Sequence, residues 1–187
     1  MIPIVQKGNP VLRQVAKEVP ISIIGTAKIS KILTRMKKAL DSQEDGVAIA
    51  APQIGESLRV FVVSERALDV PNDIEKRRKQ LKNPAKIYGH LVFINPCLTK
   101  ISKVKVLLEE GCLSVRYAYG KVRRAGKATV KAWNEKGESF TRGASGLLAQ
   151  IYQHEIDHLD GVLFTDKAVD VKEMPPERQN NELRIRN

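Results

Sequence analysis

The segment from Gly146 to Gly161 constrains the fold of this chain more than any other stretch, because it predicts one helix with a continuous hydrophobic face. Ser145 is a suitable N-cap residue, no proline follows before Gly161, and a left-handed glycine at that point typically ends a helix. At about 100° per residue, the apolar side chains of this segment form one arc. The arc consists of Leu147, Leu148, Ile151, Tyr152, Ile156 and Leu159. We therefore expect the helix to pack on a core through this arc.

The same helix carries the pattern H-E-x-x-H. His154 and His158 lie one turn apart at the edge of the apolar arc, and Glu155 falls inside it. Two imidazoles at this spacing can bind one metal ion, whereas a carboxylate on an apolar row is costly to bury without a partner or a task. Acid/base work beside a metal ion would give the glutamate that task. Because three fixed residues also coincide by chance, a metal site requires a third ligand and a pocket.

Composition predicts one ordinary globular domain. The chain has 187 residues, of which 42% are hydrophobic and 28% are charged, and its N-terminus lacks the apolar stretch of a signal peptide. We expect a single domain over residues 1–187, with a mobile tail from about residue 168, and no membrane association. Two cysteines far apart in the sequence favour a reducing compartment, so we expect a cytoplasmic protein.

The net charge of +11 would attract polyanions weakly. Lysine and arginine are spread along the chain, and aromatic residues make up only 5% of it. A dedicated nucleic-acid reader would show a recognisable module or an aromatic platform. We therefore expect no sequence-specific nucleic-acid binding, although a transient ribosome contact is compatible with the charge.

Outside the helix with the histidines, the sequence predicts a mixture of strands and one further helix. Hydrophobic periodicity favours a helix over residues 28–40, strands over 58–64 and from 90 onward, and a hairpin of 128–133 with 139–142. The charged insertion 65–89 is expected to form an exposed loop with a helical turn near residues 75–81. The motif EGCLS, residues 110–114, is expected to interrupt the strand before it.

Cys112 is the best candidate for the third ligand. A thiolate binds divalent metals strongly, and the glycine before Cys112 leaves room for close approach. A glutamate ligand, as in some metallopeptidases, would have to be Glu173 or Glu177, which lie beyond the compact region near paired prolines. We expect the other cysteine, Cys97, to be buried as a small hydrophobic residue.

Three motifs in this order, GVAIAAPQ (46–53), EGCLS (110–114) and QHEIDH (153–158), resemble those of the peptide deformylases. The stretches NPVLRQVAKEV, FINP and HLDGVLFTD also resemble that family's pattern, so the resemblance extends from about residue 3 to 167. It implies an α+β fold in which mixed and antiparallel sheets surround a central metal-binding helix, and one catalytic domain of this type.

The resemblance also implies the chemistry of the site. It makes Cys112, His154 and His158 the metal ligands and Glu155 the acid/base. Gln53 and the backbone N–H of Leu113 would be the hydrogen-bond donors to the carbonyl oxygen. The family metal is one divalent ion, ferrous iron, replaceable by zinc, nickel or cobalt. The substrate is the formyl-methionyl end of nascent polypeptides, and the products are formate and a free amino terminus. The implied substrate-binding residues are Gly46, Val47, Ala48, Ile49, Glu110, Gly111, Leu147, Gln150 and Ile151.

Two other functions remain open from the sequence. A basic RNA-binding or ribosome-binding protein could use a four-ligand structural zinc site made of Cys97, Cys112, His154 and His158. A metallopeptidase with a glutamate as third ligand is the second alternative. Both differ from the deformylase hypothesis in the identity of the ligands, which the tertiary structure can test.

Overall fold

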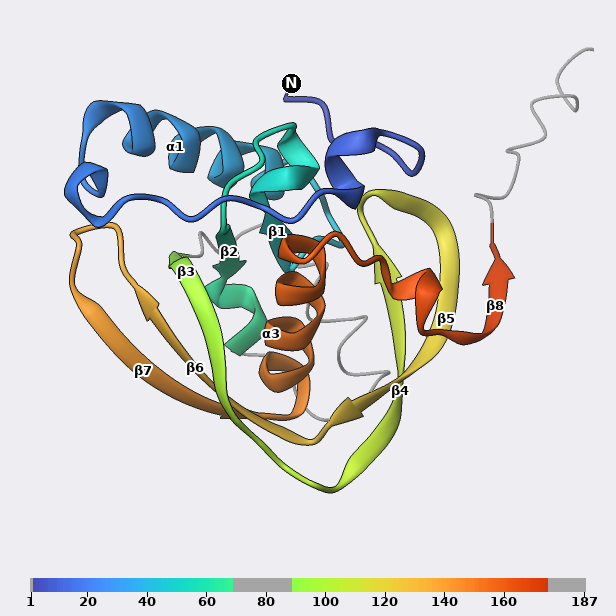
Figure 1. Cartoon of the computed structure of the whole chain (residues 1–187). Helices are drawn as coiled ribbons and strands as arrows, with labels where there is room; N and C mark the ends of the chain where they lie inside the picture. The colour runs from blue at the N-terminus through green and yellow to red at the C-terminus, as the bar shows by residue number, and fades with distance from the viewer. Residues whose placement is uncertain (1, 69–88, 175–187) are drawn as a thin grey trace, which may run out of the picture.

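A computed structural model of the chain describes residues 2–68 and 89–174 (Figure 1). Within these ranges, eight strands form two sheets, one of five strands in the order β1-β2-β3-β6-β7 and one of three in the order β4-β5-β8. All strand pairs in the two sheets are antiparallel. The strands are β1 (Ala48–Ala50), β2 (Val60–Ser64), β3 (His90–Ile101), β4 (Lys105–Cys112), β5 (Val115–Ala125), β6 (Lys127–Trp133), β7 (Ser139–Ser145) and β8 (Val169–Glu173). The helices are α1 (Ala27–Asp41) and α3 (Gly146–Leu159).

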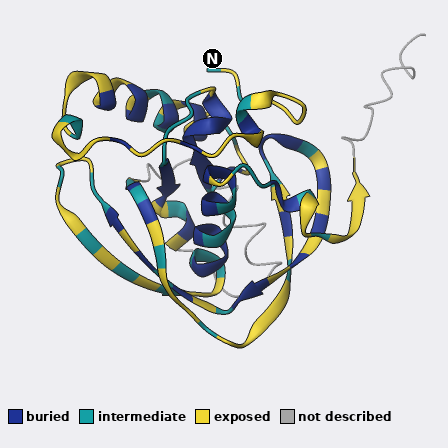
Figure 2. Ribbon diagram, in the orientation of Figure 1, coloured by how far each residue is buried: buried dark blue, intermediate teal, exposed yellow. Residues whose placement is uncertain are grey.

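The two helices cover opposite faces of the five-stranded sheet. Side chains alternate along β2, so Phe61 and Val63 pack with α3, whereas Val60 and Val62 pack with α1. Every residue of β2 is buried, as expected for a strand that is covered on both faces. Helix α3 consequently lies in the centre of the molecule, between the five-stranded sheet and the β4-β5 hairpin (Figures 1 and 2).

Helix α3 ends where the sequence predicted. Ser145 is the N-cap residue with extended backbone angles, although its side chain makes no capping hydrogen bond. Gly161 has a φ of +75°, and a Cβ atom there would lie 2.7 Å from the carbonyl oxygen of Arg13. Glycine is therefore required at residue 161 both for the left-handed backbone and for the close approach of the N-terminal arm.

The predicted α+β fold is confirmed, as are most of the predicted elements. The helix expected over 28–40 is α1, the strand expected over 58–64 is β2, and the expected hairpin is β6 with β7. The division into one domain stays a prediction. Of the expected tail, residues 169–173 form β8, which pairs with β5, and residues 175–187 lie outside the described residues. The helical turn expected near 75–81 also lies outside them, and residues 65–68 form a short 3-10 helix.

The EGCLS motif interrupts the strand as expected, although at Leu113 and Ser114 rather than at Glu110. Strand β4 continues through Cys112, and its pairing with β5 shifts register after Gly111. Strand β5 was not predicted, although buried and exposed residues alternate along it, which is typical of a strand with one covered face. Cys97 is exposed rather than buried, since the second half of β3 leaves the core after Pro96.

Candidate metal centre and pocket

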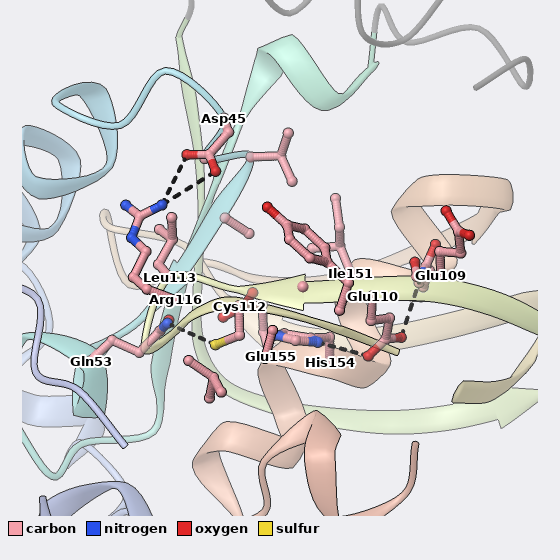
Figure 3. A pocket seen from close by; sticks show the side chains of 18 of the residues that line it. Asp45, Gln53, Glu109, Glu110, Cys112, Leu113, Arg116, Ile151, His154 and Glu155 are labelled. Carbon is pink, nitrogen blue, oxygen red and sulfur yellow. Dashed lines mark hydrogen bonds and ion pairs between the residues drawn. The ribbon is translucent and has the colours of Figure 1, made fainter. Parts of the chain in front are cut away.

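A cavity of about 380 Å³ opens beside α3. Its walls come from three segments that are far apart in the sequence: residues 45–48 before and in β1, residues 109–119 of the β4-β5 hairpin, and the first part of α3. Gln53 closes one end, next to Cys112 (Figure 3). The tertiary fold thus brings the three sequence motifs to one place.

Three side chains at the end of this cavity could hold a metal ion. Cys112 comes from the end of β4, and His154 and His158 come from successive turns of α3. One ligand atom from each of the three lies within 4.8 Å of the other two, and the Cys112 Sγ is 3.2 Å from the His158 Nε2. The imidazole centroids are 4.9 Å apart. A thiolate and two imidazoles form a donor set that several divalent transition metals accept, so the residues present fit a metal ion.

A buried ion pair orients one of the two histidines. The Nδ1 of His154 lies 2.9 Å from the Glu110 carboxylate, which leaves Nε2 of the ring for the metal position. Arg124 donates to both oxygens of Glu110, at 2.8 and 2.9 Å. Burial alone would raise the pKa of Glu110, but the hydrogen bonds from Arg124 and His154 lower it to about 2. Glu110 is therefore an acceptor for the groups around it at neutral pH.

Arg124 is a buried residue next to the site that was not predicted from the sequence. It is 4% exposed, and its Nη1 also donates to Asp157 of α3 at 2.6 Å. It sits on the inward face of β5 together with Val122, two residues earlier. That alternation was a usable signal, since a lone arginine in phase with buried apolar residues of a strand needs an acidic partner.

Glu155 is buried and one of its oxygens is unpaired. The residue is 4% exposed, and among the described residues Oε2 has no hydrogen-bond partner. Burial raises the pKa of Glu155 to about 7. It lines the cavity beside Cys112 and His154 (Figure 3). Oε2 itself is sealed from solvent, but the residue lines the cavity, so the carboxylate is placed to accept a proton from a molecule there.

The side-chain amide of Gln53 has a fixed direction. Its Oε1 accepts the backbone N–H of Ala50 at 2.7 Å, and its Nε2 donates to the Ser114 Oγ at 3.2 Å. Nε2 also lies 3.6 Å from the Cys112 Sγ, the contact drawn in Figure 3. Because Ala50 occupies the oxygen, the NH₂ group faces the cavity. This local geometry explains the lone polar residue in a run of small side chains.

The structure brings most of the predicted pocket residues together and separates one. The cavity is lined by Gly46, Val47, Ala48, Glu110, Gly111, Leu113, Leu147, Gln150 and Ile151. The side chain of Ile49 instead packs with α1 on the opposite face of the sheet, since Ile49 alternates with Ala48 and Ala50 along β1. Only its backbone could contact a molecule in the cavity.

The ligands of the alternative hypotheses lie elsewhere. Cys97 is exposed on β3 and is not part of the metal-compatible group formed by described residues. Glu173 is exposed on β8, and Glu177 lies outside the described residues. A four-ligand structural site containing Cys97 is therefore not formed.

A Cys-His-His group beside a buried glutamate, at the end of a cavity in an α+β fold, is typical of metal-dependent hydrolases. The family model "Polypeptide deformylase" matches residues 1–174 of the chain. The chain belongs to the polypeptide deformylase family.

Individual relatives agree with the family model. The chain is 39% identical over 166 residues to a peptide deformylase of Halothermothrix orenii, an alignment that covers 89% of this chain and 92% of the relative. It is 38% identical over 167 residues to the chloroplastic peptide deformylase 1A of Solanum lycopersicum, covering 88% of this chain. The chain spans 58% of the length of that plant relative.

A solved structure shares the fold. The class I type b peptide deformylase of Acinetobacter baumannii, in its structure with bound Met-Ala-Ser, superimposes with a TM-score of 0.75 at 30% identity. The superposition covers 89% of this chain and 98% of that one. In the part of our chain that the structure describes, no helix is both long and apolar enough to span a bilayer.

Proposed function

We propose that this chain is a metal-dependent hydrolase that removes the N-formyl group from formyl-methionine at the start of nascent polypeptides. One observation carries the proposal: Cys112, His154 and His158 converge at the end of a cavity where a buried Glu155 oxygen has no partner among the described residues. Family membership and the names of the relatives support the same activity.

The proposed ligands are Cys112, His154 and His158, and the proposed metal is ferrous iron, with zinc, nickel or cobalt as substitutes. The mixed sulfur and nitrogen donor set supports a transition metal over magnesium or calcium, which prefer oxygen ligands. When bound, such an ion supplies Lewis acidity and makes a neighbouring water more acidic. The hydrogen bond between Glu110 and Nδ1 of His154 keeps that imidazole in the required orientation.

The remaining chemistry is assigned to side chains of this chain. Glu155 accepts a proton from a water molecule while the water oxygen attacks the formyl carbon. Glu155 then gives that proton to the departing amine. The Nε2 of Gln53 and the backbone N–H of Leu113 donate to the oxyanion that develops on the formyl oxygen. The C–N bond breaks, and the products are formate and a peptide with a free amino terminus.

The substrate is proposed to bind as an extended strand in the cavity. Its backbone would pair with residues 46–49 on one side and with Glu110 and Gly111 on the other, because backbone hydrogen bonds accept any sequence. Its methionine side chain would lie against Val47, Leu147 and Ile151, which line the cavity. This docking mode fits an enzyme that must accept many different chains after the first residue.

The proposal is tested by replacing Glu155 with alanine. The wild-type protein, purified with ferrous iron under exclusion of oxygen, should release formate from formyl-Met-Ala-Ser. The E155A variant should retain its metal and lose about 10²- to 10⁴-fold in kcat, the usual contribution of a general acid/base. Metal content by atomic absorption and formate release by a coupled assay measure the two properties separately.

Glu173→Ala is a suitable matched control, because Glu173 is an exposed carboxylate on β8. It should leave both metal content and turnover unchanged. Undiminished turnover by E155A with bound metal would refute the role of Glu155. No formate release by the wild-type protein with any of the four metals would refute the proposed activity.

We further propose a cytoplasmic location with transient contact to the ribosome. Two free cysteines support a reducing compartment, and a net charge of +11 supports attraction to a polyanionic surface. Cosedimentation with ribosomes tests the contact, which should weaken steeply as the salt concentration rises.

A further inference from the structure

Gln150 places a polar side chain in the part of the cavity where the proposed methionine side chain would lie. It is on α3 next to Ile151 and one turn from Leu147, and all three line the cavity. Only 6% of the residue is exposed. Buried carboxamides are usually hydrogen-bonded at both the nitrogen and the oxygen. An end of the Gln150 amide that has no partner within the protein is therefore the end that can bind a ligand.

The orientation of the Gln150 carboxamide is determined by two acceptors. Its Nε2 donates to the backbone oxygen of Glu109 at 2.8 Å and to the carboxylate Oε1 of Glu110 at 3.3 Å. Arg124 donates to both oxygens of the same carboxylate, so Glu110 acts as an acceptor. A flipped amide would place the Gln150 oxygen against these oxygens and lose both hydrogen bonds. The amide nitrogen therefore faces β4.

The amide oxygen of Gln150 is consequently left for the cavity. Both of its hydrogen bonds use Nε2, and within the described part of the chain nothing donates to Oε1. Oε1 is also not among the sealed polar atoms that lack a partner, so solvent can reach it. Since the accessible space at Gln150 is the cavity that it lines, we infer that Oε1 is directed into the side-chain pocket.

We propose that Gln150 is a specificity-determining residue that widens the substrate class to formyl peptides whose first side chain ends in a hydrogen-bond donor. A methionine side chain cannot donate a hydrogen bond to Oε1, and by filling the pocket it would also keep water from donating one. A side chain of similar length with a terminal NH₂ group, such as glutamine, can replace that water. The proposal rests on the proposed deformylase activity, and it adds a substrate class to it.

The test compares formyl-Gln-Ala-Ser with formyl-Met-Ala-Ser for wild-type protein and for Gln150→Met, which has a similar length and no acceptor. The ratio of kcat/KM for the glutamine peptide to that for the methionine peptide should fall by about tenfold or more in Q150M. In this variant the amide NH₂ group of the substrate glutamine has no acceptor, and burying an unpaired polar group costs at least this factor in binding. Using the ratio removes any effect of the substitution on Glu110 or on metal content, since both substrates experience it equally.

Gln153→Met is the matched control on the same helix. The Gln153 amide is saturated by the backbone of Ala125 and Ala149, and the residue does not line the cavity. Its substitution can lower stability but should leave the substrate ratio within about twofold of the wild-type ratio, far from the change expected when a substrate contact is lost.

Binding of the product tripeptides, measured by isothermal titration calorimetry, gives a second readout that does not depend on turnover. Gln-Ala-Ser should lose affinity relative to Met-Ala-Ser in Q150M and keep it in Q153M. If formyl-Met-Ala-Ser is cleaved and neither ratio changes in Q150M, the role of Gln150 is refuted while the proposed activity stands. If no formyl peptide is cleaved, the proposed activity falls, and the calorimetric ratio still decides whether Gln150 selects the first side chain.

Discussion

Two glutamines that line the cavity present opposite ends of their amides to it. The oxygen of Gln53 is occupied by the Ala50 N–H, so its NH₂ group faces Cys112. The nitrogen of Gln150 is occupied by Glu109 and Glu110, so its oxygen remains for the pocket. The same type of side chain is therefore placed to act as a donor beside the proposed metal position (the metal end) and as an acceptor in the proposed side-chain pocket (the side-chain end).

The difference teaches that the function of a buried amide is decided by the backbone and carboxylate groups around it. Ala50, the last residue of β1, provides the N–H group for Gln53, which lies in the short 3-10 helix that follows, and the strand β4 provides the acceptors for Gln150. Glu110 contacts both ends, since it accepts hydrogen bonds from Gln150 and from His154. The two ends are thus separate in chemistry but share one support.

Arg124→Met should have the largest effect, because Arg124 holds the Glu110 carboxylate, which in turn accepts hydrogen bonds from both His154 and Gln150. Glu110 would remain buried with its principal partner missing, which costs about 3–5 kcal/mol. We expect the free energy of unfolding, measured by urea denaturation, to fall by that amount. Replacing Glu110 with Gln in the same chain should recover part of the loss, and a double variant as unstable as the single one would contradict the argument.

Gln53→Leu should disturb the metal end alone. Loss of one oxyanion donor typically lowers kcat by about 10²- to 10³-fold, or about 2.7–4 kcal/mol. Steady-state kinetics with formyl-Met-Ala-Ser measure this loss. The ratio between the formyl-Gln and formyl-Met peptides should not change in this variant, because the side-chain end is intact. A changed ratio would show that the two ends are not independent.

Removal of the metal should lower the stability of the protein. Variants of the two cysteines distinguish the proposed site, which uses Cys112, from a four-ligand site that also uses Cys97. A ligand present at a hundred times its dissociation constant stabilises a protein by about 2.7 kcal/mol. Chelation should therefore lower the Tm of the loaded wild-type protein and of Cys97→Ser, but not of Cys112→Ala. Equal shifts in both cysteine variants would contradict the assignment of Cys112.

Tyr152→Phe measures how much stability is lost when a buried polar atom has no hydrogen-bond partner, in contrast to the hydrogen-bonded amides of the two glutamines. Burial raises the pKa of Tyr152 to about 12, so the hydroxyl is neutral, and within the described residues it has no hydrogen-bond partner. Removing it should leave the free energy of unfolding unchanged or raise it by up to about 1 kcal/mol. Tyr117→Phe is the control, because Tyr117 is an exposed residue. A clear loss of stability in Y152F alone would contradict the prediction.

Asp166→Asn is remote from both ends and should have the smallest effect. The hydrogen bond from Arg13 lowers the pKa of Asp166 below its ordinary value of 3.8. The ionised carboxylate therefore stabilises the fold above pH 3.8, and this stabilisation is lost as the pH falls through the lower folded value. At neutral pH the variant should lose less than about 1 kcal/mol, because the pair is exposed. Thermal unfolding from pH 7 downward should show less acid destabilisation in D166N than in wild type.

Local periodicity made much of the fold predictable. Local signals in the sequence, namely hydrophobic spacing and residues typical of helix and turn ends, predict the bounds of α1 and α3 and the hairpin β6-β7. Strand β5 and the exposure of Cys97 were missed, because both depend on how the hairpin and the end of β3 leave the core. The end of β3 pairs with β6, and β5 pairs with β8 on the edge away from its hairpin partner β4, so both positions depend on strands that are distant in the sequence.

By itself, the sequence determined that two imidazoles and a carboxylate share one helix, since the helical repeat alone places them. It also singled out Cys112 and Gln53 as candidates. Only the tertiary structure decided that the Cys112 sulfur lies 3.2 Å from His158, that Arg124 is buried against Glu110, and which end of each glutamine enters the cavity. Most of these contacts join residues 14 to 46 positions apart, and hydrogen-bond partners at such separations are chosen by the packing of the sheets around α3.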